Sequence, residues 1–142
     1  MVEVRLRSVR VIPDPITDHS AEGDRETVTV GEAVLIGDVL YGGSDGKYWI
    51  ADASSDTTSR GKLVMAVESK CADQSCVVLL YGKLRDDSWS YMLGEILYVS
   101  IAPGGPTNIM PSATGEIVRI TGYTHKATIV FFKPESSYLE IS

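Results

Sequence analysis

The stretch GDVLYGGSDGKYWIADA, residues 37–53, decides the fold class of this protein. Two short apolar runs flank Ser44-Asp45-Gly46, and glycine accepts the positive φ angle that tight hairpin turns require. The stretch therefore predicts a β-hairpin with strands at 39–41 and 47–50. Further strand-sized runs separated by turn residues lie at 27–30, 33–36, 61–67, 76–81, 94–100, 116–122 and 128–132. Such close spacing predicts an all-β protein, a small β-barrel or a sandwich.

Evidence for helices is thin. No stretch keeps an apolar stripe at helical spacing over three turns, and only residues 86–93 leave room for one or two turns of helix.

Length, charge and hydropathy argue against a nucleic-acid-binding protein and against a membrane protein. A chain of 142 residues fits one domain that builds its own core, and a net charge of -6 argues against binding to nucleic acid. The longest apolar run, residues 127–132, is far too short to span a bilayer, and the N-terminus has no secretory apolar stretch. We therefore expect an intracellular site of synthesis, with no membrane and no nucleic acid among the partners.

A second stretch, GEILYVSIAPGGPTNIMP at 94–111, repeats the opening of the first. In both places a glycine-led strand and then an apolar strand ending in lysine follow, so residues 31–84 and 94–134 form a predicted internal repeat. Each unit has one apolar face to cover, and two units that close on each other share one core. Chance similarity is the alternative, because short β-elements often begin with turn glycines.

The N-terminal segment differs from the rest. Its residues alternate in the manner of a half-buried strand over 2–12, and Pro13-Asp14-Pro15 ends this pattern. The polar residues 17–26 are predicted to form a surface loop, which divides the chain into an arm at 1–27 and a β-domain at 28–142. We expect the first part of this arm, residues 1–12, to dock on a neighbouring subunit through its apolar and basic side chains; the alternative is an edge strand of its own domain. The candidate interface residues are Val2, Val4, Arg5, Leu6, Arg7 and Arg10.

Neither a metal site nor a disulfide is expected. Cys71 and Cys76 are the only cysteines, and His19 and His125 lie far apart in the sequence, so no zinc ligand set is apparent. Four residues between the cysteines at a hairpin mouth leave a disulfide open as an alternative, but free thiols fit a reducing cell better.

No cofactor or catalytic residue is expected. The sequence has no Gly-x-Ser-x-Gly elbow and no phosphate-binding loop, so we expect a protein that is not an enzyme; a hydrolase with two carboxylates ranks last. Five aromatic residues suggest either a sugar-stacking platform or, as we favour, anchors of the core and of a subunit interface. They are Tyr48, Trp49, Trp89, Tyr91 and Tyr123.

The order of these motifs resembles that of a known family. The string from Gly31 to Tyr41, the Asp45-Gly46-Lys47 turn and Ala51-Asp52-Ala53 are similar to the first half of the small head decoration, or capsid cement, proteins of tailed phages. The second half matches at residues 94–100, 104–105, 107 and 111, and the ending at 115–118, 120, 122, 130–132, 134 and 138–140. The resemblance covers about residues 28–141, and residues 1–27 have no match.

This resemblance implies a structural virion protein. Such proteins sit on the outside of the capsid, often as trimers, and clamp neighbouring major capsid subunits against internal pressure. We therefore expect a homotrimer that binds the major capsid protein, is made in the host cytoplasm and is located on the virion. A receptor- or glycan-binding module of a phage head fibre or tail is the alternative, since related cassettes occur there.

Overall fold

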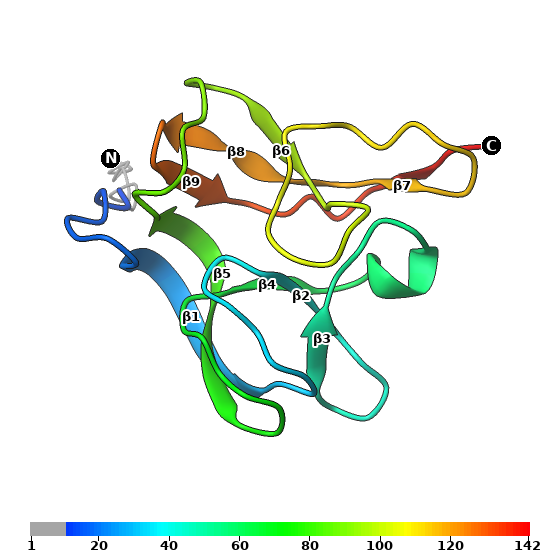
Figure 1. The fold of residues 1–142 in the computed structure, drawn as a ribbon, viewed down its shortest axis with the longest axis horizontal. Coiled ribbons are helices and arrows are strands. Elements are labelled where there is room, and N and C mark those ends of the chain that lie inside the picture. Colours follow the sequence, from blue (N-terminus) through cyan, green and yellow to red (C-terminus); the bar gives the residue numbers. More distant parts are fainter. Residues whose placement is uncertain (1–10) are drawn as a thin grey trace, which may run out of the picture.

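The computed structural model describes residues 11–142, and their regular structure is almost entirely β (Figure 1). A three-residue 3-10 helix, η1 (Asp56–Thr58), is the exception within this range. The strands are β1 (Ala21–Thr29), β2 (Val39–Gly42), β3 (Tyr48–Ile50), β4 (Leu63–Ala66), β5 (Ser75–Arg85), β6 (Ile96–Tyr98), β7 (Ile117–Val118), β8 (Ile120–Lys126), β9 (Ile129–Phe132) and β10 (Leu139–Glu140). The all-β prediction is confirmed.

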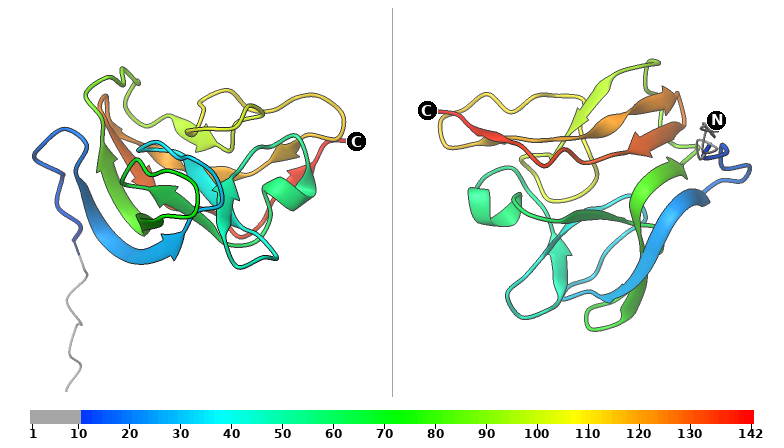
Figure 2. Two further views of the ribbon diagram at one scale, coloured as in Figure 1. Left: turned by 60° about the horizontal axis from the view of Figure 1, so that its bottom comes forward. Right: turned by 180° about the vertical axis from the view of Figure 1, so that it is seen from behind.

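Most strands belong to one strongly curled antiparallel sheet with the order β3-β2-β4-β5-β9-β8-β6. The long strand β5 pairs with β4 near Leu79 and with β9 from Gly82 onward, while β1 pairs with its other edge. We call β2, β3 and β4 the first half of the sheet, and β6, β8 and β9 the second half. Figure 2 shows that the two halves form two layers joined by β5.

The strand order reads similarly from either end. Counted outward from the central β5–β9 pair, the order is β5-β4-β2 in one direction and β9-β8-β6 in the other. Residues 31–84 contribute the first set and residues 94–134 the second. β3 has no counterpart strand, because residues 101–106 form a loop that the Tyr98–Thr107 bridge closes.

Glycines permit the sharp curl of the sheet. Gly23 of β1 and Gly82 of β5 lie opposite each other, with φ angles of 138° and 151°. A Cβ atom on Gly82 would lie 2.2 Å from the carbonyl oxygen of Glu22, so only glycine fits there. Gly122 of β8 takes the same conformation, with φ 150°.

Two hydrophobic cores result. The first lies between the layers and is shared, because it takes Met65 and Leu79 from one side and Leu97 and Phe132 from the other. The second covers the outer face of the first half. There, residues of the segment 30–36 pack onto side chains of β2, β4 and β5: the buried members are Val30, Val34, Leu40, Val64, Ala66, Cys76 and Val78.

The structure corrects two local predictions. The polar stretch 17–26 is a strand from Ala21 onward, because the backbone ladder with β5 holds β1 although Ala21 is the one buried residue among its nine. The division at residue 27 therefore falls inside a strand. Residues 33–36 are not a strand, since only Val34 forms a bridge and its side chain serves the second core. Residues 86–93, the one stretch with room for a helical turn, consist of turns and irregular structure.

Within residues 11–142, no helix has the length and apolar character needed to cross a membrane.

Candidate functional site

The predicted interface residues lie outside the described part of the chain. They are Val2, Val4, Arg5, Leu6, Arg7 and Arg10. The structure does describe the segment that follows them, residues 11–15, which joins the arm to the sheet beside the ends of β8 and β9 (Figures 1 and 2).

A polar cluster fixes this segment to the sheet, and we call it the anchor: Ile12, Asp14, Lys83, His125 and Lys126. Lys83 donates a hydrogen bond from Nζ to the carbonyl oxygen of Ile12 at 2.7 Å and another to Asp14 Oδ1 at 2.9 Å. His125 Nε2 lies 2.9 Å from the same Oδ1, and Lys126 Nζ lies 2.7 Å from Asp14 Oδ2. Two strands, β5 and the end of β8, thus surround one carboxylate with cationic or donor groups.

The electrostatics of the anchor favour a charged Asp14. Hydrogen bonds from Lys126 and Lys83 hold the pKa of this carboxyl well below its usual range, and they outweigh partial burial. The Lys83 side chain is only 10% exposed, and its ammonium lies 5.8 Å from the centre of the Phe131 ring. A buried ammonium needs such partners, so Lys83 and Asp14 stabilise each other and fix the direction in which the chain enters β1.

Sequence reasoning missed the anchor, although two signals were present. Lys83 is a single charge within the apolar run 76–84, and a buried lysine requires a partner. Asp14 stands between two prolines, which hold the backbone in an extended form. His125 was treated as a lone histidine, whereas the fold places it against Asp14.

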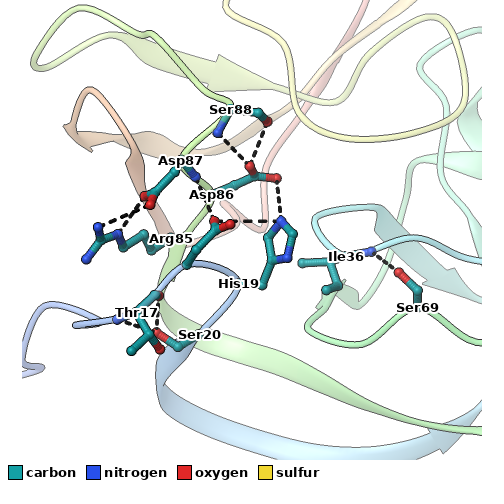
Figure 3. Close-up of polar contacts among 10 residues, drawn as sticks. Thr17, His19, Ser20, Ile36, Ser69, Arg85, Asp86, Asp87 and Ser88 are labelled. Carbon is teal, nitrogen blue, oxygen red and sulfur yellow. Dashed lines mark hydrogen bonds and ion pairs between the residues drawn. The ribbon is translucent and has the colours of Figure 1, made fainter.

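A second junction holds the turn before β1 (Figure 3). His19 donates its backbone N–H to the carbonyl oxygen of Arg85, and Asp87 donates its own to Asp18 Oδ1 at 2.8 Å. His19 Nε2 lies 3.7 Å from both Asp18 Oδ1 and Asp86 Oδ2. Burial raises the pKa of Asp86, but hydrogen bonds from Ser88 and the neighbouring imidazole outweigh it, so the pKa is lowered overall.

This junction brings together metal-ligand types that the sequence keeps apart. One ligand atom each from Asp18, His19 and Asp86 lie within 4.8 Å of one another. Carboxylate and imidazole groups in this combination suit several divalent cations. The hydrogen bonds from Asp87 and Ser88 already account for the positions of the two carboxylates, so the geometry needs no ion to explain it.

The outer face of the second half carries an apolar row. Strand pairing places Lys83 beside Phe131, Phe131 beside Tyr123, and Tyr123 beside Ile96. The Tyr123 and Phe131 rings stack with centroids 5.3 Å apart, yet Tyr123 is 40% exposed and Ile96 49% exposed. Side chains of this kind normally face a core or a partner.

Two adjoining grooves of about 220 and 410 Å³ continue from this row toward β7 and β10. They share Ile120 and Glu135, and the larger one includes Leu139, which is 70% exposed. The remaining lining residues are Ile96, Val118, Gly122, Tyr123, Lys133, Ser137 and Tyr138.

A polar hollow of about 540 Å³ lies on the first half, beside the β2–β3 hairpin. Trp49 lines it and donates a hydrogen bond from Nε1 to Asp45 Oδ1 at 3.2 Å. The Trp49 ring lies so close to Gly31 and Gly43 that a Cβ atom on either would clash with it. Tyr41, Arg60 and Lys62 complete the wall of this hollow.

The five aromatic residues singled out in the sequence do not form one platform. Trp89 and Tyr91 pack against the first core, with ring centroids 5.9 Å apart. Tyr48 packs against the second core, while Trp49 lines the hollow and Tyr123 lies on the outer face of the second half. Three of the five aromatic side chains thus pack against a core, and the other two lie on the surface.

Both cysteines are free in the structure. Cys71 is exposed, while Cys76 is buried in the second core. Burial raises the pKa of the Cys76 thiol, and the charge of Glu68 adds to this effect, so the buried sulfur stays protonated.

No model of a protein family matches the sequence, and a search of curated proteins finds no match.

Proposed function

We propose that this protein decorates the outside of a phage capsid and stabilises it by clamping neighbouring major capsid subunits. It acts by contact and not by catalysis, as a homotrimer on the virion, after synthesis in the host cytoplasm. The proposal needs neither a cofactor, a membrane nor nucleic acid.

The anchor is the observation that carries this proposal. A clamp must transmit force from its docking arm to its body, and a flexible tether would not do so. Here three cationic or donor side chains hold Asp14, and Lys83 also holds the carbonyl group of Ile12, directly after the basic arm. The resemblance of residues 28–141 to capsid cement proteins supplies the identity of the surface that is clamped.

Charge supports the same role for the arm. Residues 1–10 contain three arginines and one glutamate, so the rest of the chain contains ten basic and eighteen acidic side chains. The arm therefore carries +2 and the body -8. A basic tip on an acidic body suits an acidic receiving surface and repels incorrect orientations.

Reversing the arm charges tests this function directly. We expect the full-length protein to bind bare capsids of the phage that encodes it, and the triple variant Arg5→Glu, Arg7→Glu, Arg10→Glu to bind roughly tenfold or more weakly. Reversal of three cations on the body surface, Lys47, Arg60 and Lys70, which form ion pairs with Asp73, Asp56 and Glu68, is the control with the same change of charge. Cosedimentation with the capsids gives the affinities.

Failure of the unmodified protein to bind these capsids overturns the decoration role. Equal weakening by both triple variants overturns the role of the arm and leaves only a general charge effect.

The polar hollow favours a second candidate function, a glycan-binding module of a head fibre or tail. Trp49 is held rigidly and polar side chains surround it, as sugar sites require. Copy number separates the two functions: decoration requires many copies on each particle, whereas a tail module requires few. Quantitative mass spectrometry of purified particles measures this number.

A further inference from the structure

We propose that the outer face of the second half of the sheet receives residues 1–10 of a second copy of this chain. This inference uses the arm of the proposed function but assigns it a different receiving surface, and it can be tested without a capsid.

The receiving surface is mostly apolar, with a few polar side chains in its grooves. It begins at the stacked Phe131 and Tyr123 rings, includes Ile96, and continues through the two grooves to Leu139. Within the described residues nothing covers Tyr123, Ile96 or Leu139, which are 40%, 49% and 70% exposed. An apolar face on which several such side chains adjoin marks an interaction site.

The first half shows what such a face requires. There the segment 30–36, which bends at Gly31 and Glu32, lies across the outer face, and its valines Val30 and Val34 are 0% and 2% exposed. A connecting segment that contributes valines is thus the covering layer that this fold already uses. Residues 1–10 can also supply apolar side chains, with Val2, Val4 and Leu6 on one side of a period-2 pattern.

Residues 1–10 are long enough, and begin close enough to the edge of the sheet, to reach a neighbouring copy. The anchor holds Ile12 at Lys83, the first residue of the cross-strand row that leads through Phe131 to Tyr123 and Ile96. Ten extended residues beyond this point span about 33 Å, which is enough to follow the face of a neighbouring sheet.

The homotrimer of the proposed function supplies the second copy that would receive the arm. At the start of the described chain Val11 is 82% exposed and Ile12 is 5% exposed, because consecutive side chains of an extended chain point to opposite sides.

The charges are also complementary. Glu135 lies in both grooves and Glu140 belongs to β10, and within residues 11–142 neither carboxylate has an ion-pair partner. Arg5 and Arg7 lie on the polar side of the arm, where they would face such acids, and Glu3 offers a partner for Lys133 of the same groove.

Cross-linking between two distinguishable full-length populations tests the proposal. Both carry Cys71→Ser to remove the exposed thiol. One carries a size tag and Leu6→Cys, and the other carries Ser137→Cys in the larger groove. A short bis-maleimide is added after mixing. The matched control replaces Ser137→Cys by Ser44→Cys, an exposed serine on the opposite hairpin.

We expect a tagged–untagged product with Ser137→Cys and at most a trace with Ser44→Cys. Equal yields from the two positions, or no product from either, overturn the proposal. A chain carrying both Leu6→Cys and Ser137→Cys that cross-links only within itself also overturns it, because the arm then docks on its own sheet.

Sedimentation velocity adds a measurement that does not depend on cysteines. Leu139 and Leu35 are similarly exposed, at 70% and 68%, but only Leu139 lines the proposed groove. Leu139→Asp should weaken self-association about tenfold or more, whereas Leu35→Asp should leave it unchanged. Equal effects of the two variants contradict the proposal. If the unmodified protein shows the cross-link between copies but does not bind capsids, that result contradicts only the decoration role.

Discussion

The two halves of the sheet have similar strand orders, but they differ in how they cover their outer faces. All four residues of β4 in the first half are buried, because Leu63 and Met65 face the shared core while Val64 and Ala66 face the segment 30–36. In the second half, Phe132 faces the shared core, but its neighbour Phe131 lies on an uncovered face.

The segments that precede the two halves explain this difference. Residues 30–36 lie across the outer face of the first half. Residues 86–93 instead place Trp89 and Tyr91 on the shared core and leave Met92 and Leu93 mostly exposed. The second half therefore lacks a covering layer from the described chain, and an apolar sheet face without a layer calls for a partner.

The comparison predicts unequal effects for two adjacent phenylalanines. Phe132→Ala empties a fully buried position in the shared core and should lower the free energy of unfolding by about 3–5 kcal/mol. Phe131→Ala removes a half-buried ring from the outer face and should cost roughly 1–2 kcal/mol in the monomer. Urea unfolding at low protein concentration measures both. Equal losses would mean that the two faces are equally covered.

Gly82 tests whether the curl that separates the halves depends on glycine. Gly82→Ala combines a backbone clash with an unfavourable φ angle and should cost roughly 2–4 kcal/mol. Gly61→Ala is the control, since Gly61 also has positive φ but has open space around it, and should cost about 1 kcal/mol. Thermal unfolding followed by circular dichroism compares them. A harmless Gly82→Ala would remove glycine as the cause of the curl.

The anchor predicts a smaller, pH-dependent effect at the start of the chain. Because folding lowers the pKa of Asp14, its contribution is complete above the ordinary aspartate pKa of 3.8 and is lost as the pH falls toward the folded value. Asp14→Asn should lower the free energy of unfolding by about 1–2 kcal/mol at pH 7 and should reduce the loss of stability below pH 4. Asp73→Asn, at an exposed ion pair, is the control.

Urea unfolding of both variants at pH 7 and at pH 2.5 gives the comparison. If Asp14→Asn retains the full acid sensitivity of the unmodified protein, then Asp14 is not responsible for it.

Local turn chemistry made part of the fold predictable from the sequence. The hairpin at Ser44-Asp45-Gly46 is present, with Gly46 at φ 81°, because its geometry depends on neighbouring residues alone. The end of β1 lies within the strand predicted at 27–30, but residues 21–26 of β1 are polar and give no apolar period, so their pairing with β5 could not be predicted. Residues 33–36 have the apolar character of a strand but form no ladder: Val34 packs in the second core, Ile36 packs against the first core, and Leu35 is exposed.

The anchor could not be predicted from sequence patterns because its residues are far apart in the sequence. Asp14 and Lys83 are 69 positions apart, and no local rule pairs them. The apolar outer face likewise arises only when the pairing of β5, β9, β8 and β6 aligns Phe131, Tyr123 and Ile96 in one row.

Hydroxyl-radical footprinting tests the central claim most directly, namely that the arm of a second copy covers the outer face of the second half. The full-length protein is compared with a variant lacking residues 2–10. The account predicts that Tyr123, Ile96 and Leu139 are several-fold less oxidised in the full-length protein at high concentration, while exposed Leu35 is oxidised equally in both. Equal oxidation of Tyr123, Ile96 and Leu139 in the two proteins would contradict the account.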